Sequence, residues 1–246
     1  MRKVIDMKNM QVLASAFLGG MLVAVAGMSN LLLHDTHPVA AAVLFGVMLL
    51  SVLTLELHLM TAKAGYLFWD SSMIRTRAVH LVLTFCGNAV GAFAAGELLR
   101  LAYPSRAFAR EFVSTRFSAG AGSVIAGAVL CGMLMFVAVH AYRRSRGGVG
   151  GALVTLGAGT AIVLGGFTHS VTDMFYMAFC HMYTGRAVAV VLLGIAGNLV
   201  GAVVMSLLYE YKKSADEVYR EQQEAEEAAE RHHAHRHHHH SHESEE

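Results

Sequence analysis

The sequence is poor in the residues that cover a soluble surface and in those that break helices. Only 15% of its 246 residues are Asp, Glu, Lys or Arg, two are proline and one is tryptophan. Hydrophobic residues make up 55%, and the mean hydropathy is +0.47. This balance is typical of a helical integral membrane protein, in which the 24 glycines allow helices to approach closely.

The signatures of several functional classes are missing as well. The formal net charge is only +1, so nothing indicates a nucleic-acid partner. Cys86, Cys131 and Cys180 lie in apolar runs without a CxxC pair, and we expect them to be buried free thiols. The sequence contains no HExxH motif, no phosphate-binding loop and no Ser-His-Asp arrangement. It therefore predicts neither an enzyme nor a cofactor.

Six hydrophobic segments are present, and a membrane-spanning helix needs about 20 apolar residues. The segments are residues 11–33, 39–60, 78–103, 119–142, 151–182 and 186–210. Basic residues flank them unevenly and gather on one predicted side, which the positive-inside rule assigns to the cytoplasm. Those on that side are Arg2, Lys3, Lys8, Arg75, Arg77, Arg143, Arg144, Arg146, Lys212 and Lys213. We therefore expect a multi-pass protein of a bacterial inner membrane with both termini in the cytoplasm.

The second and fifth segments are interrupted by polar residues. In the fifth, two glycines precede the cluster Thr168-His169-Ser170, so the segment is better described as two half-helices. In the second, the interruption spans residues 56–63. An ionisable side chain at membrane depth is costly and usually faces a cavity or a translocation path. A broken membrane helix is tolerated only where it lines a cavity or is buried in protein. His169 is therefore the leading functional candidate.

An internal repeat links the two halves. The run Gly87-Asn88-Ala89-Val90-Gly91-Ala92 in the third segment matches the run Gly197-Asn198-Leu199-Val200-Gly201-Ala202 in the sixth. Three segments per unit is an odd number, so the two units must have opposite orientations in the membrane. Inverted repeats with interrupted helices at matching positions are typical of transporters. The alternative is that both runs are only small-residue packing motifs.

We expect three regions along the chain. Residues 1–212 form a six-helix membrane channel domain, residues 213–231 a charged cytoplasmic helix, and residues 232–246 a disordered tail. Eight of the fifteen histidines lie between residues 231 and 242. Such a tract is able to bind a divalent metal such as Zn²⁺.

The sequence resembles the formate–nitrite transporter family over about residues 10–212. The family's fifth-span motif, GFxHSxxNM, corresponds to residues 166–174, and its second-span motif, ELxTGN, to residues 58–63. A fourth-span pattern, GILCN, corresponds to residues 128–132, and both GN runs fit the family as well. The resemblance implies an all-α, aquaporin-like fold: an inverted 3+3 repeat of six transmembrane helices with helices two and five broken. It also implies a homopentamer with one pore per protomer.

The chain departs from the family motifs at several positions. Asp173 replaces an Asn, His58 replaces a Glu, and Arg116 falls where a Lys near the outer mouth is usual. The family's fold can therefore be expected of this chain with more reason than the family's substrates, because the substrate depends on the residues of the site. By this resemblance the substrate pathway is formed by His169, Thr61, Asp173, His58, Leu59, Phe167, Lys63 and Arg116.

Six of the eight pathway residues have an expected effect on the passage of a small anion. Arg116 would raise the local anion concentration, and Leu59 and Phe167 would form apolar constrictions. Thr61 and His169 would donate hydrogen bonds, with His169 able to alter the protonation of the substrate. Asp173 either points away into the protein, bonded to an asparagine such as Asn88 or Asn198, or repels anions and favours neutral or weakly acidic substrates.

The leading prediction is thus a channel or permease for a small monovalent anion, such as formate or nitrite, or for its conjugate acid. One alternative is an aquaporin-like pore for small neutral solutes, which the lack of an Asn-Pro-Ala element disfavours. A second is a membrane protein that handles metals or other cations through Glu56, His58, Asp173 and the histidine-rich tail.

Overall fold

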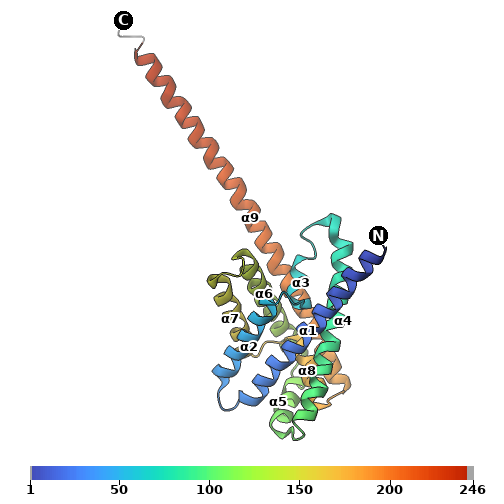
Figure 1. The fold of residues 1–246 in the computed structure, drawn as a ribbon. Helices are drawn as coiled ribbons and strands as arrows, with labels where there is room; N and C mark the ends of the chain where they lie inside the picture. Colours follow the sequence, from blue (N-terminus) through green and yellow to red (C-terminus); the bar gives the residue numbers. More distant parts are fainter. Residues whose placement is uncertain (1, 243–246) are drawn as a thin grey trace. The chain divides into compact units, whose positions relative to one another are not determined.

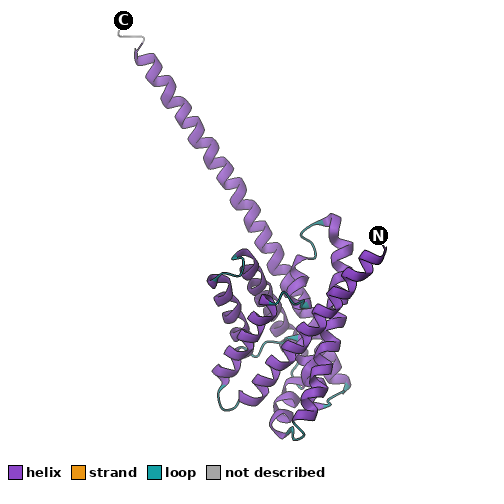
Figure 2. Ribbon diagram, in the orientation of Figure 1, coloured by secondary structure: helices purple, strands orange, loops and turns teal. Residues whose placement is uncertain are grey.

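The computed structural model describes the backbone of residues 2–242 and the surroundings of the side chains of residues 7–224. The described chain is helical, without strands (Figure 2). It divides into two compact units, residues 1–206 and 207–246. The helices are α1 (Arg2–Leu33), α2 (Pro38–Thr54), α3 (Met60–Lys63), η1 (Ala64–Tyr66), η2 (Ser71–Met73), α4 (Ile74–Ala102), α5 (Ala107–Phe117), α6 (Ala121–Arg144), α7 (Val149–Leu164), α8 (Ser170–Cys180) and α9 (Gly185–His242).

Four stretches are long and apolar enough to cross a membrane. They are Met7–Leu33, Ser71–Ala102, Ala121–Arg144 and Gly185–Glu224. Two shorter apolar helices, α2 and α7, have 17 and 16 residues. At 1.5 Å per residue each covers only about 25 Å, less than the roughly 30 Å hydrocarbon core. A membrane protein is therefore indicated, and the chain beyond α2 and α7 has to complete any crossing.

The helices of the first unit pack pairwise around the short helices. α1 lies along α4 and also contacts α2, while α7 contacts both α2 and α6 (Figure 1). α8 packs against α4, α1 and α5, and each of its residues is buried. Its sequence is apolar on nearly every face, which is the pattern of a helix enclosed by protein. Cys131 and Cys180 are buried as expected, whereas Cys86 on α4 is exposed, contrary to the prediction.

Both interruptions close with the same backbone geometry. Leu57 donates its N–H to the carbonyl five residues earlier at 2.9 Å, and Phe167 does the same at 3.0 Å. The preceding residues, Glu56 and Gly166, have φ angles of 54° and 63°. This hydrogen bond and left-handed residue are those of a glycine-type helix end. Glu56 adopts the conformation despite its Cβ, and the two sites lie at equivalent positions of the sequence repeat.

Close backbone contacts explain the glycines of both GN runs. A Cβ on Gly91 would lie 2.1 Å from the carbonyl oxygen of Phe17, and one on Gly201 would lie 2.0 Å from that of Val129. Both distances are far below van der Waals contact, and a backbone atom has little room to yield. Small residues here let neighbouring helices approach, as is typical of membrane helix interfaces.

Gly201→Ala should therefore lower the free energy of unfolding by about 1–3 kcal/mol or more, because the added methyl group forces two helices apart. Thermal melting of the purified protein in detergent measures the effect. Gly157→Ala is the matched control, since its Cβ would meet nothing within 4 Å. An equal loss in both variants would contradict this account.

Helix α9 extends across the boundaries predicted for the end of the chain. It runs without a break through residues 213–231 and into the histidine-rich segment as far as His242. Residues 243–246, and the side chains beyond residue 224, lie outside the described part of the chain. The division at residue 212, the disordered tail and its metal binding stay predictions.

Candidate functional site

Two buried asparagines hold the chain at the two interruptions. Asn88 accepts a hydrogen bond from the N–H of Met60 at 2.8 Å and donates to the carbonyls of Ala16 and His58 at 2.7 and 2.8 Å. Every polar group of its amide is thereby used by backbone. Such bonds replace those that the interrupted helix leaves unmade, which is what permits irregular backbone at membrane depth.

Asn198 plays the same part at the other interruption. It accepts from the N–H of Ser170 at 3.0 Å and donates to the carbonyls of Ala128 and Thr168 at 2.9 and 2.8 Å. Neither asparagine bonds to Asp173, so that expected role for the carboxylate is wrong. Because these amides are occupied by backbone, Asp173 has to find its partner elsewhere.

His169 caps the first turn of α8. Its Nδ1 accepts from the N–H of Thr172 at 3.3 Å and lies 3.0 Å from the Thr172 hydroxyl. Because Nδ1 accepts a backbone hydrogen bond, the neutral ring carries its proton on Nε2. That nitrogen lies 3.4 Å from the hydroxyl oxygen of Thr61, and both side chains are at most 2% exposed. The structure thus brings together two of the predicted site residues from the two interruptions.

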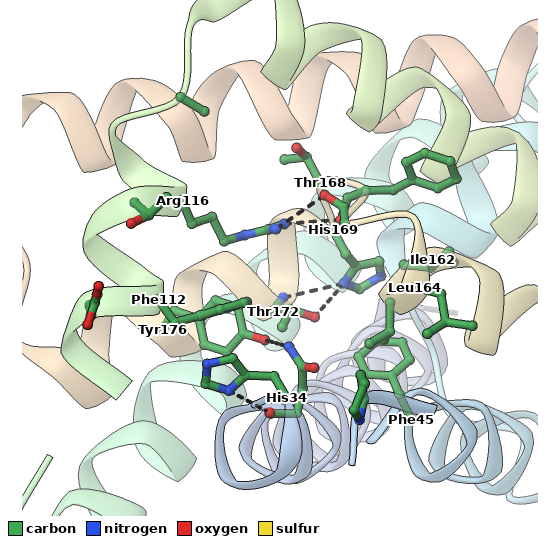
Figure 3. Close-up of a pocket in the computed structure, with 18 of the residues that line it drawn as sticks. His34, Phe45, Phe112, Arg116, Ile162, Leu164, Thr168, His169, Thr172 and Tyr176 are labelled. Carbon is green, nitrogen blue, oxygen red and sulfur yellow. Dashed lines mark hydrogen bonds between the residues drawn. The ribbon is translucent and has the colours of Figure 1, made fainter. Parts of the chain in front are cut away.

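A cavity of about 740 Å³ opens beside His169 (Figure 3). We call it the Arg116 cavity. Its lining includes Arg116, Phe167, His169, Phe45 and Tyr176. The ring of Phe45 meets His169 edge-on at 6.2 Å between centroids. The imidazole therefore stands at an aromatic wall of the cavity.

A second cavity, of about 580 Å³, opens at the other interruption. We call it the Lys63 cavity. Its lining includes the predicted residues His58, Leu59 and Lys63. The two cavities share no lining residue, and Thr61 lines neither of them. Leu59, only 1% exposed, borders the Lys63 cavity, as is suited to the apolar constriction expected of it.

Asp173 pairs with Arg116. The guanidinium Nε of Arg116 donates to Asp173 Oδ1, and its Nη atoms reach the carbonyls of Gly166 and Phe167 at 3.4 and 3.1 Å. Asp173 is fully buried, whereas the Arg116 side chain is 16% exposed. Asp173 thus lies in the first turn of α8, where its charge opposes the partial positive charge of that helix end, and Arg116 bonds to the link between α7 and α8.

This pairing was not evident from the sequence. Arg116 lies on α5, an 11-residue helix in a stretch where no helix was predicted. α5 is held by its buried residues Ala109, Val113 and Phe117, which repeat at a helical spacing. That spacing is the signal that could have located it. The partner carboxylate lies 57 residues further along the chain.

Part of the backbone at the start of each half-helix is bonded to side chains. The N–H groups of Met60 and Ser170 bond to the asparagines, and that of Thr172 bonds to His169. The Thr61 hydroxyl and the His169 Nε2–H add side-chain donors beside these helix ends, which also carry a partial positive charge.

A known family matches nearly the whole chain. The sequence profile of the formate/nitrite transporter family matches residues 1–232. The chain belongs to this family. The resemblance predicted from the motifs of spans two and five is thereby confirmed. The family consists of transporters rather than enzymes, and no curated protein matches the chain individually.

Solved channels share the fold. One described as a pentameric formate channel with formate bound is 15% identical, with a TM-score of 0.73 over 85% of this chain and 98% of that chain. Another, described as an FNT family ion channel, is 21% identical, with a TM-score of 0.67 over 86% of this chain and 99% of that chain. At these identities the likeness establishes the fold of the family and leaves the site chemistry to be argued from this chain.

The structure does not bring together Glu56, His58 and Asp173, three of the ligands expected for a cation-handling protein; the histidine-rich tail lies outside the described side chains. Glu56 and His58 line the Lys63 cavity, whereas Asp173 is bonded to Arg116 at the other interruption. Among the side chains of residues 7–224, no three of His, Cys, Asp or Glu are grouped as metal ligands.

Proposed function

We propose that this formate/nitrite transporter family member is a membrane channel or permease for a small monovalent anion, such as formate or nitrite, or for its conjugate acid. The path runs from the Arg116 cavity past His169 and Thr61 to the Lys63 cavity. The observation that supports this best is the buried pair of polar groups, His169 Nε2 and Thr61 Oγ1: His169 lines the Arg116 cavity, and Thr61 adjoins Ala62, which lines the Lys63 cavity. A bare ion in hydrocarbon is very costly, and such donors reduce that cost.

We further propose six spans arranged as an inverted 3+3 repeat, with α2–α3 and α7–α8 as the interrupted members. The matching asparagine bonds and the matching helix ends, all at equivalent positions of the sequence repeat, support this arrangement. A homopentamer is part of the proposal. An apolar groove on α1 and α4, lined by Met10, Phe17 and Leu18 among others, offers a surface for a second copy. By the positive-inside rule the Lys63 cavity faces the cytoplasm of a bacterial cell.

In this proposal His169 acts through its Nε2–H. A neutral imidazole that accepts at Nδ1 can donate to an anion at Nε2 while it keeps its bond to the N–H of Thr172; only the 3.4 Å contact between Nε2 and Thr61 would give way. Full protonation would place a proton on Nδ1, against the N–H of Thr172. Hydrogen-bond donation is thus the role that the geometry supports best, and proton transfer to the substrate stays a prediction.

His169→Ala should lower formate flux into proteoliposomes by at least about tenfold, since one charge-assisted donor contributes about 1.5–3 kcal/mol. His169→Gln, which keeps an amide donor, should retain more flux than alanine if donation is the role. Stopped-flow flux measurements between pH 5 and 8 test both variants.

His37→Ala is the matched control, because His37 is exposed on the loop before α2 and lines neither cavity. Formate or nitrite flux that is absent from the wild type at every pH would refute the anion proposal. Unchanged flux in His169→Ala would refute the role of the histidine.

A neutral-solute pore is the second candidate, favoured by one observation. Arg116 is bonded to Asp173, so the charge expected to attract anions is compensated. Swelling of proteoliposomes in small neutral solutes, without any anion current, would support this candidate over the first.

A further inference from the structure

The Lys63 cavity gathers positive charge. Its lining holds three cations, Lys63, Arg143 and Arg146, against one carboxylate, that of Glu56. None of these four side chains forms an ion pair within residues 7–224. The cavity therefore has an excess of two formal positive charges that no described protein group compensates.

The Arg116 cavity has the opposite balance. The cation that it contains is bonded to Asp173, and Asp35 and Glu111 add two carboxylates to its lining. The two ends of the proposed path thus differ in charge. The sequence repeat shows the same contrast. Lys63 in its first half and Asp173 in its second half occupy matching positions and carry opposite charges.

Membrane topology alone does not account for this cluster. Basic residues at the cytoplasmic end of a span follow the positive-inside rule, and Arg144 is an example that does not line the cavity. Lys63, however, lies within α3, beyond the interruption, rather than in a loop. Arg143 and Arg146 flank Arg144 but line the same cavity as Lys63.

The contacts of Arg143, Arg146 and His58 show how these side chains are held at the cavity. The Arg143 guanidinium lies over the Tyr66 ring, 4.8 Å from its centroid. Arg146 follows in the turn that ends α6, with its N–H bonded to the Arg143 carbonyl at 3.1 Å. His58 also lines the cavity, and its Nδ1 is buried with no hydrogen-bond partner among the described residues. Guanidinium groups match the geometry of oxyanions especially well.

We propose that the Lys63 cavity is a binding site for a divalent oxyanion, such as sulfate or hydrogen phosphate. Doubling the charge of the ligand doubles its attraction to each of the three cations. Leu59 lines the cavity and is buried, and the apolar constriction proposed at this residue would stop a hydrated tetrahedral dianion. The bound ion occupies the entrance that a monovalent substrate has to use, and it lowers flux; this last consequence rests on the proposed function.

Equilibrium dialysis of ³⁵S-labelled sulfate against the purified full chain in neutral detergent tests the site. Sodium chloride keeps the ionic strength constant. We expect saturable binding that unlabelled phosphate displaces, weakened about tenfold in Arg146→Gln or Lys63→Gln through the loss of one close charge. Arg144→Gln is the matched control and should bind as the wild type does. Binding that is absent, or that Arg144→Gln weakens as much as Arg146→Gln does, overturns the proposal.

A flux measurement separates this proposal from the proposed function. With sulfate on both faces of the proteoliposome, formate flux should fall several-fold in the wild type, and the ratio of flux with and without sulfate should return toward one in Arg146→Gln. Sulfate binding without any formate flux would refute the transport proposal and leave the site standing. Formate flux with sulfate binding that is independent of Lys63 and Arg146 would refute the site alone.

Discussion

Asp173→Ala should lower the free energy of unfolding by about 3–5 kcal/mol, because it leaves a largely buried guanidinium without its counter-charge. Arg116 keeps its bonds to the carbonyls of Gly166 and Phe167, but these carry only partial negative charge. The first turn of α8 also loses an anion that opposes its dipole. We expect the region around His169 to loosen, and formate flux to fall together with stability.

Chemical denaturation in mild detergent measures this effect. Asp216→Ala is the matched control, because the Lys212–Asp216 pair lies on the exposed surface of α9, where such a pair contributes at most about 0.5 kcal/mol. Asp173→Asn, which restores the family's residue and keeps an oxygen in place, should fall between the two. If Asp173→Ala and Asp216→Ala cost the same, the pair does not hold the interruption together.

Asn198→Leu should be comparably damaging. Leucine is similar in size but leaves two backbone groups of the interruption unpaired, the N–H of Ser170 and the carbonyl of Thr168, while the carbonyl of Ala128 keeps only its bond within α6. An unsatisfied buried group costs about 1–3 kcal/mol, so we expect a loss of about 2–6 kcal/mol and no formate flux. The start of α8 would then lack the bond that fixes the residue next to His169.

Two further asparagine variants calibrate this result in thermal melts. Asn88→Leu removes the same three kinds of bond from the other interruption and should cost as much. Asn30 is also buried, yet its side chain donates a single bond, to the Tyr176 hydroxyl at 3.0 Å. Asn30→Leu should therefore cost about 1 kcal/mol. Equal losses of stability in Asn30→Leu and Asn198→Leu would show that the bonds to the interruption contribute no more than a single buried hydrogen bond.

The interruptions could be predicted from the sequence because membrane depth makes polar residues conspicuous. His169 stands out in an apolar run, and Thr61 belongs to the polar residues that interrupt the second segment at the matching place of the repeat. Their approach to 3.4 Å fits that expectation. Family membership followed from the motif at residues 166–174 and is confirmed by the profile match.

The partners of the charged groups could not be predicted in the same way. The bond between Arg116 and Asp173 depends on where α5 packs, which is a property of the tertiary structure. Asn88 and Asn198 were visible as part of a repeated GN run, but their amides turn toward backbone that is 28 to 72 residues away in the chain. Local sequence patterns report burial and periodicity, whereas such contacts arise only when the helices assemble.

The two asparagines have a consequence for how this chain is able to change over evolutionary time. They hold each interruption through backbone atoms, which are the same whatever side chains stand there. The side chains of His58, Leu59 and Thr168 take no part in these bonds, so we expect that they can be exchanged while the scaffold persists. If the repeat arose by gene duplication, the two interruptions began as equivalent sites and then diverged. One now carries Leu59 and Lys63, and the other carries His169 and Asp173 at the matching positions. Substitutions at one interruption could in that way change the selectivity for the substrate while the backbone of the other interruption stays as it is.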